Sequence, residues 1–175
     1  MGARPFLVHA GGLRRTVGTR RPEHLEGPID DLDCSGSAVP DDAPVVVDVV
    51  LESVIGGVAV TGTVRAPWAG VCRRCLAPAG GELSVAVREL YTAGGDDEET
   101  YALHGDDVDL EPMARDAVLL ELPQAPLCRP ECAGLCPWCG ADRNLGPCGC
   151  TPPVDPRWRA LDELRPEHER AGGEP

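Results

Sequence analysis

The nine cysteines of this 175-residue chain are the residues whose type and spacing can support specific chemistry. Eight of them are clustered, at positions Cys72, Cys75, Cys128, Cys132, Cys136, Cys139, Cys148 and Cys150. Two thiolates separated by two residues can bind one metal ion from a tight turn, and four thiolates close its tetrahedral shell. Because the ligands are soft and no histidine lies at a matching spacing, the pattern predicts zinc.

Residues 135–140 read Leu-Cys-Pro-Trp-Cys-Gly, the form of a zinc knuckle. The first predicted site joins this knuckle to the following Cys-Gly-Cys and contains Cys136, Cys139, Cys148 and Cys150. The second contains Cys72, Cys75, Cys128 and Cys132, and would tie the middle of the chain to its C-terminal part. The order of the cysteines alone does not decide how the eight divide. Cys34 lies in a polar segment and is expected to take no part.

Two catalytic interpretations of the cysteines are weaker. Cys132, Cys136 and Cys139 have the spacing of the iron–sulfur motif of radical SAM enzymes, but that motif normally comes early in a large domain. A thiol oxidoreductase needs a Cys-x-x-Cys pair at a helix N-terminus to lower a thiol pKa, whereas Cys72 is predicted to lie between antiparallel strands. Structural zinc, without enzymatic activity, is therefore the favoured interpretation. The four histidines match no catalytic spacing.

The elements that must position these cysteines begin at Val45. Alternating apolar residues predict a strand over 45–52, and the pair Gly56-Gly57 predicts a type I′ hairpin turn into a second strand. A further strand is expected over 82–91. The acidic segment 94–109 is predicted to be an exposed loop broken by a short strand at 101–103.

A helix is expected to follow, capped by Asp109 and ended by Pro123, with Leu120 and Leu122 extending its apolar side. The fold class is thus α+β: an antiparallel sheet, a covering helix and a C-terminal zinc-knuckle or ribbon-like module.

The predicted domain organisation has four parts. Residues 1–44 form a basic N-terminal arm and an acidic linker, and residues 45–126 form the sheet with its helix. Residues 127–165 form a cysteine-rich zinc module with a short helix, and residues 166–175 form a disordered tail. No apolar stretch reaches the roughly 20 residues of a membrane helix, and the first residues do not resemble a signal peptide. We therefore expect a cytoplasmic protein with reduced thiols.

The net charge of −13 argues against a protein that binds nucleic acid nonspecifically. The charge is uneven, because residues 1–21 contain five arginines and no acidic residue, which leaves −18 for the remainder. Any RNA contact must therefore be local. The candidate contacts with RNA or a partner protein are the arginines of the N-terminal arm and of the first Cys-x-x-Cys turn, namely Arg14, Arg15, Arg20, Arg21, Arg73 and Arg74.

Three stretches resemble the YceD family, in its actinobacterial branch. They are VRAPWAGVCRRCL at 64–76, LCRPECAGLCPWCGAD at 127–142 with the closing CGC at 148–150, and DPRWRALDEL at 155–164. The resemblance covers about residues 45–165. The N-terminal region departs from it, because this chain has a shorter basic motif followed by an acidic stretch over 23–42.

Members of this family are bacterial and plastid proteins linked to accumulation of the large-subunit ribosomal RNA, often encoded beside a zinc-ribbon protein of the large ribosomal subunit. The resemblance implies a non-enzymatic factor for large-subunit (23S) rRNA accumulation and 50S ribosome assembly. Its partners would be rRNA, a 50S ribosomal protein or both, with no membrane and no small-molecule substrate. The acidic body leaves an alternative open, a chaperone-like partner of a basic ribosomal protein. A thiol redox or iron–sulfur enzyme is the least favoured function.

Overall fold

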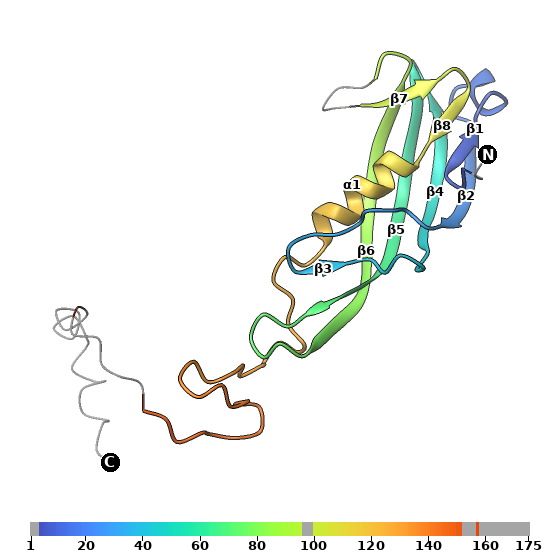
Figure 1. Cartoon of the computed structure of the whole chain (residues 1–175). Coiled ribbons are helices and arrows are strands. Elements are labelled where there is room, and N and C mark those ends of the chain that lie inside the picture. The colour runs from blue at the N-terminus through green and yellow to red at the C-terminus, as the bar shows by residue number, and fades with distance from the viewer. Residues whose placement is uncertain (1–3, 96–99, 152–156, 158–175) are drawn as a thin grey trace. The chain divides into compact units, whose positions relative to one another are not determined.

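The computed structural model describes residues 4–95, 100–151 and 157. Two compact units divide the chain, one over residues 1–134 and the other over residues 135–175. The first unit contains the sheet and its helix (Figure 1). Its elements are β1 (Leu7–His9), a short 3-10 helix η1 (Leu13–Arg15), β2 (Arg20–Gly27), β3 (Ser37–Ala38), β4 (Val45–Val54), β5 (Gly57–Val71), β6 (Pro78–Thr92), β7 (Tyr101–His104), β8 (Asp107–Asp109) and α1 (Glu111–Glu121).

The sheet has the strand order β1-β8-β7-β6-β5-β4-β2, and β3 pairs with β5. Alternation along β4 places its odd-numbered residues in the core, as the sequence predicts, and Val45, Val47 and Leu51 are fully buried. The two edge strands approach one another, because the guanidinium of Arg21 in β2 donates to the carbonyl of His9 in β1 at 2.9 Å. The sheet therefore curls around a single hydrophobic core.

The prediction of an antiparallel sheet is only partly correct. All described pairings are antiparallel except that of β6 with β7, which is parallel and matches Tyr91 with Tyr101. The two tyrosine rings stack with centroids 5.2 Å apart. A parallel pair requires the chain to return to the same end of the sheet between its two strands. The sheet is therefore mixed.

The region expected to be an arm and linker is largely part of the sheet. Residues 20–27 form β2, which pairs with β4 in full register, and β3 adds a second short strand. The sequence hides β2 because it is a polar edge strand that contains Pro22, and proline is tolerated where the outer N–H groups need no partner. Leu7–His9 supplies β1 in the same region.

Two local predictions also need correction. The β4–β5 turn is centred on Ile55 and Gly56, and of these only Gly56 has positive φ (+88°), so the turn is not type I′. Gly57 instead begins β5, where an added Cβ would lie 2.0 Å from the carbonyl oxygen of Tyr91.

Helix α1 packs on β5 and β6 (Figure 1), and it ends before Pro123 as predicted. Its N-cap is Leu110 and not Asp109, whose carboxylate accepts a hydrogen bond from the Glu111 N–H. Leu122 is buried, but Leu120 is 87% exposed because it lies on the solvent side of the helix.

Among the described residues, no helix has the length and apolar character needed to cross a membrane. The short helix predicted within residues 155–164 and the predicted disordered tail over 166–175 lie outside the described residues, apart from Arg157.

Candidate metal centres

The β5–β6 hairpin positions the first Cys-x-x-Cys pair. Its strands pair without interruption from Gly57–Thr92 to Val71–Pro78, so residues 72–77 form the closing loop. The Cys72 N–H donates to the carbonyl of Ala77 at 2.8 Å, and the Leu76 N–H donates to the carbonyl of Cys72 at 2.9 Å. Leu76 adopts a left-handed φ of +61°, which lets the loop close within a few residues. The hairpin thus holds both thiols in a fixed turn.

The segment after α1 brings Cys128 and Cys132 to the same loop. The backbone N–H of Arg73 donates to the carbonyl of Pro126 at 2.9 Å, and the guanidinium of Arg74 donates to the carbonyl of Cys132 at 2.9 Å. Gly134 has a φ of +73° and approaches so closely that a Cβ would lie 2.9 Å from the Arg74 carbonyl oxygen. Contacts independent of any metal therefore align the two segments.

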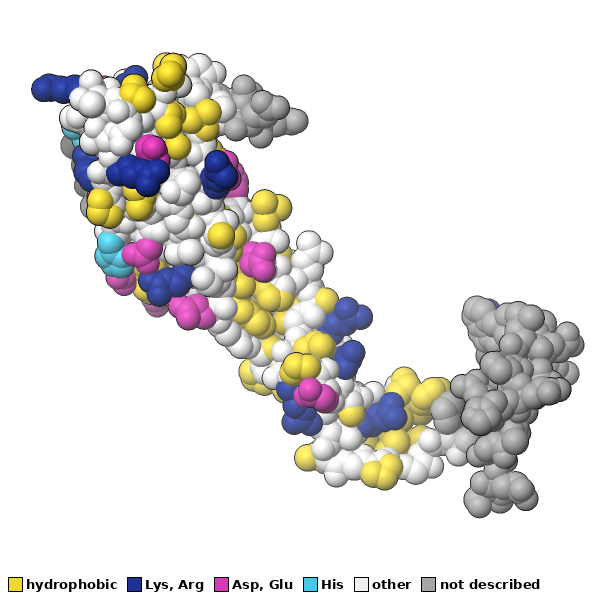
Figure 2. All heavy atoms as spheres, turned by 180° about the vertical axis from the view of Figure 1, so that it is seen from behind, with side chains coloured by type: hydrophobic (Ala, Val, Ile, Leu, Met, Phe, Trp, Pro, Cys, Tyr) yellow, Lys and Arg dark blue, Asp and Glu magenta, His cyan; other side chains and the backbone are white. Residues whose placement is uncertain are grey.

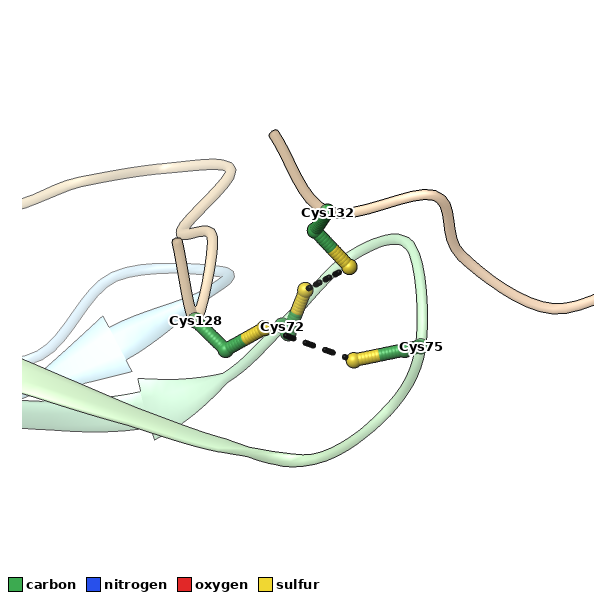
Figure 3. Close-up of side chains that lie close together, drawn as sticks. All are labelled: Cys72, Cys75, Cys128 and Cys132. Atoms are coloured by element: carbon green, nitrogen blue, oxygen red, sulfur yellow. Dashed lines mark hydrogen bonds between the residues drawn. The ribbon is translucent and has the colours of Figure 1, made fainter. Parts of the chain in front are cut away.

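We call Cys72, Cys75, Cys128 and Cys132 the hairpin quartet. Figure 3 shows their side chains pointing toward one another, and their four sulfurs all lie within 4.8 Å. The Sγ–Sγ distance is 3.8 Å for Cys72–Cys132 and 3.6 Å for Cys75–Cys128. These distances are too long for a disulfide. They match the separation of about 3.8 Å between thiolates bound tetrahedrally to a zinc-sized ion at about 2.3 Å. The quartet can therefore hold a metal ion.

The surroundings of the hairpin quartet are half apolar. Cys72 and Cys132 are buried and form a small cluster with Ala79, against which Trp68 and Leu127 pack. Burial by itself would raise the pKa of Cys72, but backbone N–H groups, led by that of Cys128, outweigh it and lower the pKa to about 6. The hydrogen bond that the Cys128 thiol donates to Cys75 is the main cause that raises the pKa of Cys128 to about 12. One thiol of the quartet is thus prepared to be a thiolate near neutral pH.

Cys136, Cys139, Cys148 and Cys150 form the C-terminal quartet, which lies entirely in the second unit. Its sulfurs also all lie within 4.8 Å of one another. The chain turns tightly here, because the Cys136 N–H donates to the carbonyl of Ala141 at 2.8 Å and the Gly140 N–H donates to that of Cys136 at 2.9 Å. Gly140 has a φ of +72°, which favours glycine at this position.

The knuckle of the C-terminal quartet also prepares one thiolate. Backbone N–H groups of Cys139 and Trp138 lower the pKa of Cys136 to about 6, against the opposing effect of burial. The hydrogen bond that the Cys150 thiol donates to Cys139 is the main cause that raises the pKa of Cys150 to about 12. Cys136 is buried, whereas Cys139 and Cys150 are exposed. This quartet too can hold a metal ion.

The structure therefore brings together the two groups of four cysteines that the sequence analysis named. The order of the cysteines leaves their division into two groups open. The hairpin loop brings Cys72 and Cys75 close to Cys128 and Cys132, and this determines the grouping in the structure. Cys34 lies apart from both quartets, with its sulfur 3.6 Å from Ser37 Oγ and 3.7 Å from the carbonyl oxygen of Pro123. The backbone N–H of Gly36 is the main cause that lowers the pKa of Cys34.

The N-terminal arginines belong to the folded first unit and not to a free arm, since Arg14 and Arg15 lie in η1 and Arg20 and Arg21 lie in β2. Arg14 contacts Asp106 at 3.0 Å, and Arg20 contacts Glu52 at 2.7 Å. Arg21 lies against Glu23 and also donates to the His9 carbonyl. Of the four predicted contact residues in this region, Arg15 is the one without a side-chain partner among the described residues.

The two arginines of the hairpin loop, Arg73 and Arg74, also differ in whether their side chains have partners within the protein. Both are exposed, and Figure 2 shows cationic side chains at the end of the sheet that the hairpin forms. Arg74 is turned toward the neighbouring segment, because its guanidinium donates to the carbonyls of Cys132 and Pro130. Arg73 has no side-chain partner within the described part of the chain.

The sequence analysis did not single out two surface residues of the second unit, Trp138 and Arg143. They line one concavity of about 340 Å³ whose lining also includes Cys136, Cys148 and Cys150 of the C-terminal quartet. The tryptophan inside the Cys-Pro-Trp-Cys motif was the available signal, because a side chain between two ligands of a tight knuckle has little protein around it.

Comparison with known proteins identifies relatives of the chain. The family model described as the large ribosomal RNA subunit accumulation protein YceD matches residues 60–165, which include all eight clustered cysteines. Uncharacterized proteins of Mycobacterium bovis and Mycobacterium tuberculosis are each 43% identical over 135 residues, covering 73% of this chain and 65% of the relative. An uncharacterized protein of Mycobacterium leprae is 37% identical over 130 residues, covering 70% of this chain and 59% of the relative.

The match thus spans less than two thirds of the length of these mycobacterial proteins. No solved structure matches the chain significantly. The family model extends over more than half of the 175 residues and includes both quartets. On this match, the chain belongs to the YceD family.

Proposed function

We propose that this protein is a non-enzymatic factor that supports accumulation of the large-subunit (23S) rRNA and assembly of the 50S ribosomal subunit in the cytoplasm. The observation that carries the proposal is the family match over residues 60–165, since the family description names rRNA accumulation. The two quartets agree with a binding protein, because four thiolates around one ion leave no open position for a substrate.

Zinc is the metal that we propose for both quartets. The donor set consists only of sulfur, and the spacing of the sulfurs fits a tetrahedral ion. Zinc bound in this way has a structural role. In the first unit it would join the hairpin loop to the segment after α1, and in the second it would hold the knuckle closed.

Arg73 is the strongest of the six proposed contact residues. It is exposed at the hairpin loop and pairs with no other described residue, so its guanidinium is free to bind a phosphate bidentately. Arg15 has the same property in the N-terminal region. Arg14, Arg20, Arg21 and Arg74 keep internal contacts, which a partner would have to share or displace.

A chaperone-like role toward a basic ribosomal protein is the second candidate. The charge of −18 outside the first 21 residues favours it, because such a body repels RNA and attracts a basic chain. Each zinc bound by four thiolates would add a further site of charge −2. The two functions therefore differ in which polymer of the ribosome is the direct partner.

In-cell crosslinking followed by purification under denaturing conditions tests the proposal. We expect recovery of 23S rRNA or large-subunit proteins, and an Arg73→Glu variant should recover less. Arg88→Glu is the matched control, because Arg88 is another exposed arginine of the same hairpin with no side-chain partner among the described residues. Crosslinks to protein alone would favour the chaperone-like role. Recovery of neither rRNA nor ribosomal protein would overturn the proposal.

A further inference from the structure

The surface of the second unit near the C-terminal quartet carries an exposed tryptophan and an arginine that metal binding does not require. Trp138 is 53% exposed although it belongs to one of the most apolar residue types, and it makes no ring contact with another described residue. It lines a concavity of about 340 Å³ together with Arg143, Pro137 and Pro147. The rest of the lining belongs to the C-terminal quartet and its turn, namely Cys136, Cys148, Gly149 and Cys150. The feature to be explained is therefore an uncovered indole next to a cation.

The knuckle holds the indole in a defined place. Trp138 lies between two cysteines of the quartet, and its own backbone N–H is directed to the Cys136 sulfur. Its ring is therefore attached to the most constrained part of the unit. A rigid aromatic face loses little conformational entropy when a ligand stacks on it.

Arg143 offers an anionic group a direct contact, next to a quartet that carries a charge of −2 when it holds zinc. The side chain of Arg143 has no partner among the described residues. The one acidic residue within 135–151 is Asp142, and its Oδ1 accepts hydrogen bonds from the backbone N–H of Asn144 at 2.9 Å and from the Asn144 side-chain amide at 2.6 Å. The acid is thus engaged locally, and the guanidinium is left for a ligand.

The size of the concavity distinguishes a nucleobase from a protein partner. A stable protein interface buries about 800 Å² on each side, whereas this concavity of about 340 Å³ also includes the space at the quartet's cysteines. The room left beside Trp138 and Arg143 therefore suits one small group. An exposed aromatic with an adjacent cation is the arrangement by which proteins bind unpaired bases and their phosphates. Stacking also suits a chain of net charge −13, because it does not require a broad basic surface.

We infer that Trp138 stacks on one unpaired base of single-stranded RNA and that Arg143 binds the adjacent phosphate. The inference rests on the proposed function, in the form in which RNA is the direct partner. It assigns the RNA contact to the second unit, in addition to Arg73 in the first. Duplex RNA should not use this site, because its bases are already stacked and paired.

Fluorescence anisotropy with the zinc-loaded full chain and a labelled single-stranded RNA octamer tests this inference. Trp138→Ala should raise the Kd about 5- to 100-fold, the range expected for one stacked base, and Trp138→Phe should retain most of the affinity. Arg143→Gln should reduce the salt dependence by about 0.7 in log–log slope, which is the value for one phosphate contact. Leu145→Ala is the matched control, since Leu145 is a 90% exposed apolar residue of the same unit and should have no effect.

Zinc content must be equal in all variants, so that a loss of binding reports the contact and not the fold. An unchanged Kd for Trp138→Ala, or equal binding of duplex and single strand, would overturn the inference. In the crosslinking experiment, a Trp138→Ala variant that loses a ribosomal protein while its RNA crosslinks persist would overturn the inference as well. The proposed function would survive these results if crosslinking still recovers rRNA or ribosomal protein, so the two failures are distinguishable.

Discussion

The two cysteine quartets have the same ligands but different relations to the chain around them. In the hairpin quartet, the paired sulfurs come from residues 60 and 53 positions apart, and they lie at the end of a sheet with its own hydrophobic core. In the C-terminal quartet, all four cysteines fall within 136–150. Among the described residues of that unit, no hydrophobic cluster is present, since both clusters belong to the first unit.

This difference gives the metal two distinct roles. In the first unit, a bound ion would cross-link segments that backbone hydrogen bonds and packing already align, such as the bond from the Arg73 N–H to the Pro126 carbonyl. In the second unit, the ion would replace a core that the sequence does not supply. The same coordination chemistry would therefore add stability to one fold and create the other.

Removal of the C-terminal metal should have the largest effect. Cys139→Ser removes one ligand at an exposed position, so no packing is lost with it. We expect residues 135–151 to lose their structure, because zinc binding supplies about 10–16 kcal/mol of folding free energy in comparable small modules. The first unit should keep its melting temperature. Hydrogen exchange by mass spectrometry, together with zinc analysis, measures both effects.

Cys34→Ser serves as the control for this experiment, because Cys34 belongs to neither quartet and its loss should leave the zinc content unchanged. Amide protection over residues 135–151 that persists without zinc would show that the second unit has another source of stability. The contrast between the two quartets would then be wrong.

The corresponding change in the hairpin quartet should have a smaller and different effect. Cys75→Ser removes one ligand of a cross-link between positions 53 residues apart. By analogy with a covalent cross-link of that loop length, the free energy of unfolding of the first unit should fall by about 4 kcal/mol. The sheet should remain folded with a lower melting temperature. Calorimetry measures the change, and complete unfolding at 25 °C would contradict the role of the metal as an addition to an existing core.

The sequence predicts the parts of this fold in which hydrophobic alternation is strong. Strand β4 is the clearest such part, because buried and half-buried positions alternate along its whole length. In β5 and β6 the buried positions are less regular, and β6 begins at Pro78, four residues before the predicted strand. The sequence does not reveal β2, because an edge strand tolerates polar residues along its length and a proline at position 22. It does not reveal the parallel pairing of β7 either, since a strand of four residues carries no signal of its direction.

The division of the cysteines illustrates the same limit. Local spacing identifies the knuckle at Cys136 and Cys139. The partnership of Cys72 with Cys132 depends instead on where a hairpin of two 15-residue strands ends relative to the segment after α1. That is a tertiary property. The partners of the arginines are a tertiary property too. The sequence cannot show that Arg20 in β2 pairs with Glu52 in the adjacent strand β4, or that Arg73 pairs with none of the described acidic residues.

The hairpin loop allows a finer test of the alignment that exists without metal. Arg74→Ala removes the hydrogen bond to the Cys132 carbonyl and should lower the stability of the first unit by about 1 kcal/mol. Arg73→Ala should leave it unchanged, because the Arg73 side chain contacts no described partner. Urea denaturation of the zinc-loaded chain measures both values. Equal losses for the two variants would remove the distinction between a positioning arginine and a contact arginine.

Proton release on zinc binding sharpens the comparison at the level of a single thiol. The lowered pKa of Cys72, about 6, depends on N–H groups of a hairpin that stays folded without metal. A lowered thiol pKa stabilises the metal-free fold, and this contribution is complete at pH values above the ordinary pKa of a thiol. It is lost as the pH falls through about 6. The pKa of Cys136 depends on N–H groups of the knuckle, which we expect to unfold when the metal is removed.

Near pH 7.5 the metal-free hairpin quartet should therefore already hold one thiolate that the metal-free C-terminal quartet lacks. Zinc binding should release about one proton fewer from the hairpin quartet, because ligands must lose their protons before they bind. Calorimetric titration in buffers of different ionisation enthalpy gives the proton count, with Cys139→Ser isolating the hairpin quartet and Cys75→Ser isolating the C-terminal one. Equal numbers of protons released by the two quartets would mean that backbone N–H groups still donate to the Cys136 sulfur without zinc. The second unit would then fold before the metal binds.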